Sequence, residues 1–418
     1  MKQTILALTL LISGLYAVAQ QKNKLSAGQW RGELERADGN NIVFNFEVTG
    51  NAGKQMLYIR NAAERLAVND ITIVKDSVFI KLPFFDSQFR AVFINDNQIK
   101  GVWIKRLADR NTVMPFVAVN EGKKGYRFKT ASKKPAADIT GRWATAFSDP
   151  GNERVVKAVG VFNQKGTVLT GSFLTPSGDY RYLEGVVDGD SLKLSGFDGG
   201  YALYFTAKID DAQTISGGKY FSSVGAVPRI WEAQKDAAAR LPDNLSATRL
   251  RPGASPKLNF TFNDVDGKPV SVNEQRFKDK VVIVQILGSW CPNCMDETVF
   301  MNEIYEKYKS RGVEILGLAY ERTADFTRSQ QSVRNFVKRL EVEYPVLITP
   351  VAVSDPQRAE KTLPQLESIP AFPTTIFVDR KGEIQKIHAG FNGPGTGADY
   401  EKQKKEYIAI IEDLLAQQ

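Results

Sequence analysis

The chain has 418 residues, of which 43% are hydrophobic and 24% are charged, and this composition argues against a disordered protein and against a polytopic membrane protein. At roughly 150 residues per domain, the length predicts two to four domains. Two cysteines and a single histidine exclude a disulfide scaffold and a zinc site made of four protein cysteines. The net charge of +8 is mild for this length and no long Lys/Arg cluster occurs, so we expect no nucleic-acid partner. Because cysteine and histidine are scarce, we also expect no metal site, and we expect no cofactor.

The first 19 residues have the pattern of a signal peptide. Lys2 precedes an apolar stretch over residues 5–19 that is too short for a comfortable membrane span and ends in Ala17-Val18-Ala19, the small-x-small pattern of a cleavage site. Polar residues follow at once. We therefore expect a mature chain that begins near Gln20 in the periplasm or cell envelope. An N-terminal anchor helix is the alternative interpretation of the same residues.

Residues 25–235 carry short runs of alternating polar and apolar residues, broken by Gly, Asn and Asp, with little helical periodicity. The motif Gly28-Gln29-Trp30 recurs as Gly141-Arg142-Trp143, and two further short motifs recur in the same order at nearly the same spacing. The pattern predicts two β-rich repeats, residues 22–120 and 136–235, each a small barrel or sandwich of roughly eight strands.

The Gly-x-Trp motif at the predicted first strand of each repeat resembles the opening of lipocalin-type barrels, although the resemblance covers only three residues. A small barrel can hold a small-molecule ligand, or its interior can be filled by its own side chains. Both interpretations of the β-rich half are open at this point.

Residues 236–255 are rich in Ala, Arg, Pro and Ser and are predicted to form a linker. Residues 256–418 have a different pattern. A continuous apolar run over residues 281–287 predicts a strand buried on both faces, residues 292–311 predict a helix that ends at Gly312, and further strands alternate with amphipathic helices. The predicted fold class is therefore a multidomain protein, with a duplicated β-rich half followed by an α/β domain with helices on both faces of its sheet.

The two cysteines lie in Trp290-Cys291-Pro292-Asn293-Cys294, which follows the buried strand directly and opens the next helix. Cysteines three residues apart at a helix start can form a small, reversible disulfide ring. Cys291 lies at the helix N-terminus, where the helix dipole and unpaired N–H groups favour a thiolate, whereas Cys294 is one turn deeper. This asymmetry predicts a Cys291–Cys294 redox disulfide with Cys291 as the attacking nucleophile and Cys294 as the resolving thiol. A zinc site would need a second half that this chain lacks.

Together with Phe372-Pro373-Thr374-Thr375 and Glu297, this motif makes residues 256–418 resemble a thioredoxin-fold domain, and within that superfamily the exported TlpA/ResA-like thiol–disulfide oxidoreductases. The resemblance implies that Pro373 is a cis-proline facing the active-site disulfide and that the backbone of Phe372 pairs with a client peptide like an added strand. The substrate-binding residues that it implies are Trp290, Pro292, Phe372, Pro373 and Thr374.

Glu297 occupies the position of an acid that such proteins place three residues after the second cysteine. It could accept the proton of the resolving thiol, or it could merely complement the positive helix start. Thioredoxins proper have a buried acid six residues before the first cysteine, where this chain has Gln285. The missing acid gives Glu297 more weight as a catalytic candidate.

The resemblance implies an exported disulfide reductase that acts on client proteins with cysteines and is recharged by a membrane electron donor. One alternative is a binding protein whose β-rich half captures a ligand or an envelope partner. A thiol peroxidase is the third hypothesis, although Gly288 stands where peroxiredoxins have a threonine.

Overall fold

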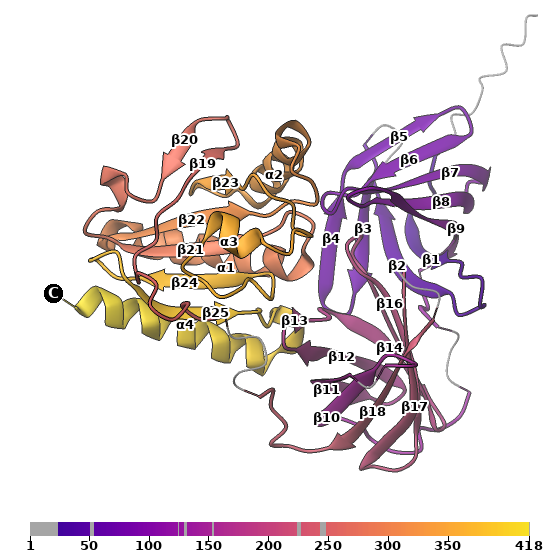
Figure 1. Cartoon of the computed structure of the whole chain (residues 1–418). Coiled ribbons are helices and arrows are strands. Elements are labelled where there is room, and N and C mark those ends of the chain that lie inside the picture. Colours follow the sequence, from indigo (N-terminus) through magenta and orange to yellow (C-terminus); the bar gives the residue numbers. More distant parts are fainter. Residues whose placement is uncertain are drawn as a thin grey trace, which may run out of the picture.

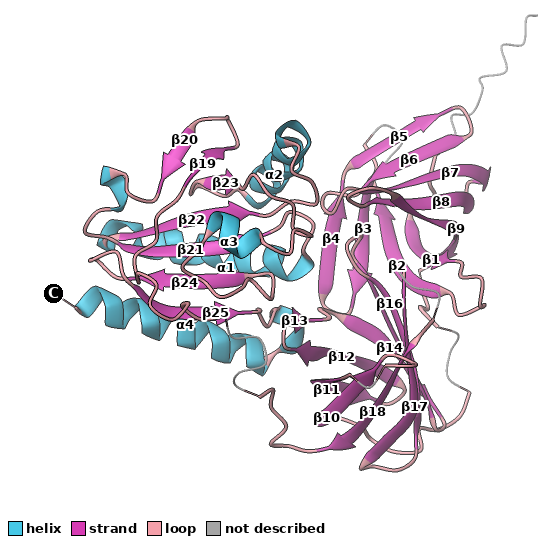
Figure 2. Cartoon of the chain, viewed as in Figure 1, coloured by secondary structure: helices cyan, strands magenta, loops and turns pink. Residues whose placement is uncertain are grey.

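The structure is a computed structural model that describes residues 24–50, 54–123, 125–128, 132–152, 154–223, 227–242 and 248–417. The predicted signal peptide, residues 1–19, lies outside the described residues. None of the helices in the described ranges is long and apolar enough to cross a membrane. The predicted fold class is confirmed, because two antiparallel β units precede a thioredoxin-fold domain (Figure 2).

The first β unit is a nine-stranded sheet with the order β4-β3-β2-β1-β9-β8-β7-β6-β5. All pairings are antiparallel, and most strands alternate buried and exposed side chains, as expected for a sheet with one face in a core. The strands are β1 Gly28–Leu34, β2 Ile42–Thr49, β3 Met56–Asn61, β4 Glu64–Val68, β5 Asp70–Val74, β6 Ser77–Lys81, β7 Ser87–Asn95, β8 Gln98–Arg106 and β9 Asn111–Gly122.

The second β unit has the order β11-β10-β18-β17-β16-β15-β14-β12-β13, and an additional pairing of β11 with β12 closes it into a barrel. It therefore also contains nine strands, where the sequence predicted roughly eight. The strands are β10 Gly141–Ser148, β11 Val155–Lys165, β12 Val168–Thr175, β13 Gly178–Asp179, β14 Leu183–Asp188, β15 Ser191–Phe197, β16 Ala202–Ile209, β17 Thr214–Ser222 and β18 Arg229–Lys235.

The repeated Gly-x-Trp motif adopts the same local structure in both units. Gly28 and Gly141 share a φ of +123°, a value that L side chains rarely adopt. Trp30 and Trp143 are fully buried, and each indole nitrogen donates to the carbonyl four residues earlier, at 2.8 and 2.9 Å. The motif thus places one tryptophan at the same point of each core.

The two units share a hydrophobic core. Phe197, Tyr204 and Phe221 of the second unit are buried among the core residues of the first, and the rings of Phe197 and Phe44 lie 4.2 Å apart. Strands β15 and β16 of the second unit pack against β2 of the first, and β15 also packs against β3. The two units therefore form one body (Figure 1).

The thioredoxin-fold domain has a seven-stranded sheet with the order β20-β19-β23-β22-β21-β24-β25. The central strands β21 and β22 run parallel and are almost entirely buried. The strands are β19 Thr261–Asp264, β20 Pro269–Ser271, β21 Val281–Leu287, β22 Val313–Ala319, β23 Val346–Ile348, β24 Thr374–Val378 and β25 Ile384–Ala389, and the short 3-10 helices are η1 Gln275–Phe277, η2 Lys309–Arg311 and η3 Pro394–Thr396.

Four α-helices cover the two faces of this sheet, as the sequence predicted. They are α1 Pro292–Tyr308, α2 Phe326–Leu340, α3 Arg358–Thr362 and α4 Ala398–Ala416. Residues of α1, α2 and α4 share one core with Val281 and Ile283 of β21, whereas α3 packs with Val282 and Val284 on the opposite face. Both β units lie along one side of this domain, at the end of the sheet where α1 begins (Figure 1).

Candidate active site

The cysteine motif lies where β21 ends and α1 begins. Cys291 is the N-cap of α1, and its sulfur accepts a hydrogen bond from the backbone N–H of Cys294 at 3.2 Å. Pro292 occupies the first turn, where no N–H donor is needed. The two cysteines are not joined by a disulfide in this structure; Cys294 is fully buried and Cys291 is 4% exposed. The predicted asymmetry of depth is therefore present, but the first cysteine is also largely covered.

Burial is the main cause that raises the pKa of the Cys294 thiol well above its usual value. Its hydrogen bond to Cys291, the negative charge of Cys291 and that of Glu297 act in the same direction. Cys294 is therefore held as a thiol, which suits a group that acts after the first sulfur has reacted.

The segment around Pro373 faces the first cysteine. The Phe372–Pro373 peptide bond is cis, and the Cys291 thiol lies 3.5 Å from the carbonyl oxygen of Phe372. The Trp290 ring is 5.4 Å from that of Phe372, and its nitrogen donates to the carbonyl of Tyr320 at 2.8 Å. Trp290, Pro292 and Phe372 line a cleft with Cys291, whereas Thr374 is fully buried and donates its hydroxyl to the Ala371 carbonyl.

Glu297 is fully buried and contacts residues of β21, β24 and α4, so it does not lie at a solvated helix start. Its carboxylate accepts hydrogen bonds from Gln285 at 2.8 Å, from Thr375 at 2.6 Å and from Tyr407 at 3.1 Å. Burial raises its pKa to about 7. A carboxyl that titrates near neutral pH and influences Cys294 fits a proton acceptor better than a helix-dipole partner.

Gln285 occupies the position of the missing thioredoxin acid and orients Glu297. The side chain is fully buried, and its amide nitrogen also lies 3.2 Å from the Thr298 hydroxyl, while its oxygen accepts from Tyr344 at 3.0 Å. The polar cluster of Gln285, Glu297, Thr375 and Tyr407 was not predicted as a unit, because its members come from two strands and two helices, β21, α1, β24 and α4.

The β units contact the candidate active site directly, which the sequence did not predict. The amide nitrogen of Asn293 donates to the carbonyl and the carboxylate of Asp179, and the hydroxyl of Tyr201 donates to the Asn293 oxygen at 3.0 Å. Gly200 packs so closely that an added Cβ would lie 2.7 Å from Pro292. The second β unit therefore covers the cysteine motif.

A buried ion cluster joins all three parts of the chain next to this contact. Arg181 of the second unit forms ion pairs with Glu64 of the first unit at 2.7 Å, with Asp198 at 2.7 Å and with Asp296 of α1 at 2.8 Å. All four side chains are buried, with at most 11% of the side chain exposed. Removing one member of such a cluster leaves uncompensated charge in a low-dielectric interior, so the cluster fixes the relative position of the three parts.

The turn between β6 and β7 reaches the same site from the first unit. Phe85 and Asp86 have positive φ values of 68° and 47°, which non-glycine residues adopt infrequently. Phe85 is buried in the same core as Cys291 and Cys294, and the Phe84 ring lies 6.3 Å from Phe336 of α2. This turn thus anchors the first unit beside the dithiol.

Comparison with known proteins identifies the C-terminal part. Residues 253–404 match the family model described as Redoxin. The thiol-disulfide oxidoreductase ResA of Bacillus thuringiensis subsp. konkukian (strain 97-27) is 32% identical over 154 residues, which are 37% of this chain and 75% of that protein. The chain belongs to the ResA family of thiol-disulfide oxidoreductases.

Other members of the ResA family and solved structures also match. The ResA protein of Halalkalibacterium halodurans is 28% identical over 156 residues, which are 37% of this chain and 74% of that protein. A crystal structure of a thiol:disulfide interchange protein from Chlorobium tepidum TLS is 24% identical, covers 39% of this chain and 97% of that chain, and has a TM-score of 0.29. The β units lie outside the residues that match the Redoxin model.

Proposed function

We propose that this thiol–disulfide oxidoreductase is exported and reduces disulfide bonds of client proteins, with Cys291 as the nucleophile and Cys294 as the resolving thiol. One observation carries the proposal: the Cys291 sulfur caps α1 while Cys294 lies buried beside it as a thiol. The backbone N–H of Cys294 points at the Cys291 sulfur, the atom that would attack the client disulfide.

The reaction has two exchange steps. The Cys291 thiolate attacks one client sulfur, a mixed disulfide forms, and the other client sulfur leaves as a thiolate. Cys294 then loses its proton to Glu297, attacks the Cys291 sulfur and releases the second client thiolate. The client disulfide gains two electrons, and the protein is left with a Cys291–Cys294 disulfide.

The remaining roles follow from the family. The proposal assigns client binding to Trp290, Pro292, Phe372, Pro373 and Thr374, of which the first three line the cleft and the last two are buried. A membrane electron donor would return the protein to the dithiol form. Residues 1–19 would act as the signal peptide, and the boundaries at 22–120, 136–235, 236–255 and 256–418 would separate the four parts of the mature chain.

Two structural observations disfavour the other hypotheses. The interiors of both β units are filled with aromatic side chains, including Phe44, Trp103, Trp143 and Phe173, which supports structural units over ligand carriers. A Cβ at Gly288 would lie 2.3 Å from the Trp290 ring, so the threonine of a thiol peroxidase does not fit here.

The test is to trap clients with the Cys294→Ala variant of the full chain. This variant cannot resolve its mixed disulfide, so exported proteins should accumulate covalently on Cys291 and be identified by mass spectrometry. The Cys291→Ala variant is the matched control and should accumulate none. Equal recovery from both variants, or none from either, contradicts the proposal.

A further inference from the structure

The cleft beside Cys291 has a volume of about 400 Å³ and is lined by all three parts of the chain. Its charged lining residues are Lys105 from β8 and Arg322, which follows β22. Among the described residues that line the cleft there is no carboxylate. The volume lies in the range of about 300–1000 Å³ that small ligands occupy in proteins. The space next to the reactive sulfur is therefore positively charged and large enough for a short segment of a substrate.

Lys105 occupies a position that an apolar residue would normally fill. It is 7% exposed and points inward two residues after the fully buried Trp103. Its ammonium donates to the Gly200 carbonyl, and no ion pair to it occurs within the described parts of the chain. Burial, and then the positive charge of Arg322, lower its pKa to about 8. The Asp198 carboxylate that partly offsets these effects is already paired with Arg181.

Arg322 is the second cation and lies on the other wall. Its guanidinium is 5.2 Å from the centre of the Trp290 ring, and its buried Nε has no hydrogen-bond partner within the described residues. The neighbouring Glu321 carboxylate accepts from the N–H and the hydroxyl of Ser289, both at 2.8 Å. The negative charges of Glu321 and Asp86 favour the cationic form of Arg322, as that of Asp198 does for Lys105. Within the described residues, however, neither cation forms an ion pair, so an anion that binds between them would supply a direct partner.

We propose that Lys105 and Arg322 form a carboxylate-binding site that selects disulfides with an acidic group next to the sulfur attacked by Cys291. The inference rests on the proposed function and specifies its substrate class. A carboxylate in the cleft would contact both cations while the adjacent sulfur approaches Cys291, because all three groups line the same space.

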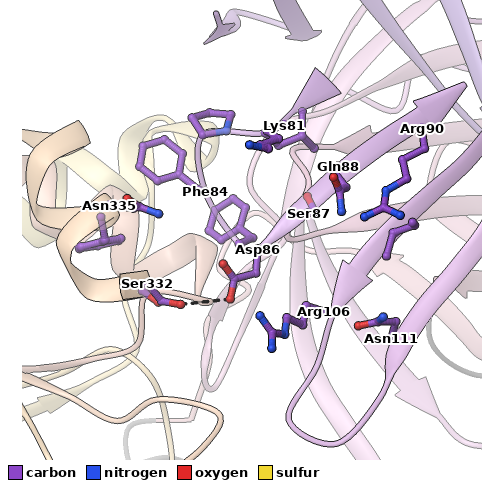
Figure 3. A pocket seen from close by; sticks show the side chains of 16 residues that line it. Lys81, Phe84, Asp86, Ser87, Gln88, Arg90, Arg106, Asn111, Ser332 and Asn335 are labelled. Atoms are coloured by element: carbon purple, nitrogen blue, oxygen red, sulfur yellow. Dashed lines mark hydrogen bonds between the residues drawn. The ribbon is translucent and has the colours of Figure 1, made fainter. Parts of the chain in front are cut away.

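The positive charge continues away from the cleft along the contact between the first β unit and α2. A neighbouring cavity of about 510 Å³ is lined by Lys81, Arg90 and Arg106, with Asp86 as the single carboxylate among its described lining residues (Figure 3). A narrow gap that borders both spaces is lined by Asp86, Ser289, Trp290 and Arg322. Acidic residues further along a client chain would therefore also meet positive charge.

The experiment measures single-turnover reduction by the full chain, reduced beforehand and freed of reductant. The probes are two peptides with one internal disulfide that differ only in the residue next to the first cysteine, Glu or Gln. We expect the second-order rate constant for the Glu peptide to exceed that for the Gln peptide by roughly ten-fold at low salt, and the ratio to fall as ionic strength rises. Glutathione disulfide is the third probe. If its rate constant equals that of the Glu peptide, the site binds small acidic disulfides. If its rate constant is lower, the site binds acidic segments of proteins.

Variants locate the effect in the cleft. Lys105→Gln and Arg322→Gln should each bring the ratio of the Glu-peptide rate to the Gln-peptide rate close to one. Arg322→Lys should keep most of the difference between the two rates. Lys100→Gln, at an exposed position of β8, the strand that carries Lys105, should leave the ratio unchanged. Equal wild-type rates for the two peptides overturn the inference and leave the proposed function standing. Equal slowing of both peptides by Arg322→Gln also overturns it, because the cation would then act on the Cys291 sulfur. If the wild-type protein reduces neither peptide, the proposed function itself fails.

Discussion

Asn293, which lies between the two cysteines, donates hydrogen bonds from its amide nitrogen to the backbone carbonyl and the carboxylate of Asp179, at 3.1 and 3.2 Å. The two residues are 114 positions apart in the sequence and belong to different parts of the fold. Helix α1 is thus held at its first turn by a β unit that lies outside the residues matched by the Redoxin model. We infer that the β-rich half shapes access to the dithiol.

Gly200→Val should expose Cys291. A Cβ at this position would lie 2.7 Å from Pro292 and 2.9 Å from the Phe85 ring, so the larger side chain must push the β units away from the cysteine motif. Overpacking typically destabilises a closed, well-packed state by about 1–3 kcal/mol. If the reagent reaches Cys291 only after local opening, the same free energy makes alkylation roughly five- to hundred-fold faster. The measurement is the rate of alkylation by iodoacetamide. Gly160→Val, which would crowd Phe162 inside the second unit, is the control; equal acceleration by both variants contradicts the prediction.

Asp296→Asn should destabilise the whole chain. It removes one of the carboxylates that neutralise the buried Arg181, and breaking a buried ion pair on one side costs about 3–5 kcal/mol. Urea unfolding followed by tryptophan fluorescence measures the loss. Arg249→Gln, which removes an exposed partner of Glu367, should have little effect. If Asp296→Asn unfolds at the wild-type urea concentration, the cluster does not join the parts of the chain as described.

Glu297→Gln should slow the resolution of the mixed disulfide by roughly 10²- to 10⁴-fold, the usual contribution of a positioned general base. Because burial raises the pKa of Glu297 to about 7, the wild-type resolution rate should rise with pH around 7, and the variant should lose that rise. Rapid-mixing measurements of client release provide the rates. The exposed Glu303 of the same helix supplies the control Glu303→Gln. A Glu297→Gln variant with the wild-type rate and pH profile would remove Glu297 from the mechanism.

The same carboxyl should make stability depend on pH. The folded-state pKa of Glu297 is raised from 4.5 to about 7, so its protonated form is favoured in the folded chain. Its contribution to stability is complete below the unfolded-state pKa and is lost as pH rises through about 7. The free energy of unfolding should therefore fall between pH 4.5 and 7, and Glu297→Gln should reduce that fall by up to about 3 kcal/mol. Unfolding at pH 5 and pH 8 tests this; an equal fall in both proteins would show that Glu297 titrates normally. Asp179 and Glu321, whose pKa values burial also raises to about 7, remain in both proteins and keep part of the slope.

Much of the thioredoxin-fold domain could be predicted because its signals are local. The apolar run at Val281–Leu287 is a strand buried on both faces, and the cysteine motif with Pro292 marks the start of α1. The helix ends near Gly312, whose φ of 94° suits glycine. In the β-rich half, the repeated Gly-x-Trp motif indicated two equivalent units, and the two buried tryptophans make equivalent hydrogen bonds.

The contacts between the parts could not be predicted from local patterns. Asp179 and Tyr201 lie in short polar segments typical of turns, and nothing near them in the sequence indicates that they reach Asn293. Lys105 stands two residues after Trp103, so the alternation of strand β8 places it on the buried face. A lysine at such an inward position is the one sequence signal that could have marked Lys105 as a binding residue. Gln285 was recognised as a missing acid, but its role in holding Glu297 became visible only when β21, α1 and β24 were placed together.

The most direct test of the dithiol chemistry is an equilibrium redox titration of the full chain in buffers of reduced and oxidised dithiothreitol, with the thiol state read by alkylation and mass spectrometry. We expect one reversible two-electron transition, in which Cys291 and Cys294 become inaccessible to alkylation together. Either Cys291→Ala or Cys294→Ala should abolish this transition. Two sulfurs that remain separately alkylatable under oxidising conditions, or that oxidise without returning to thiols, would contradict it.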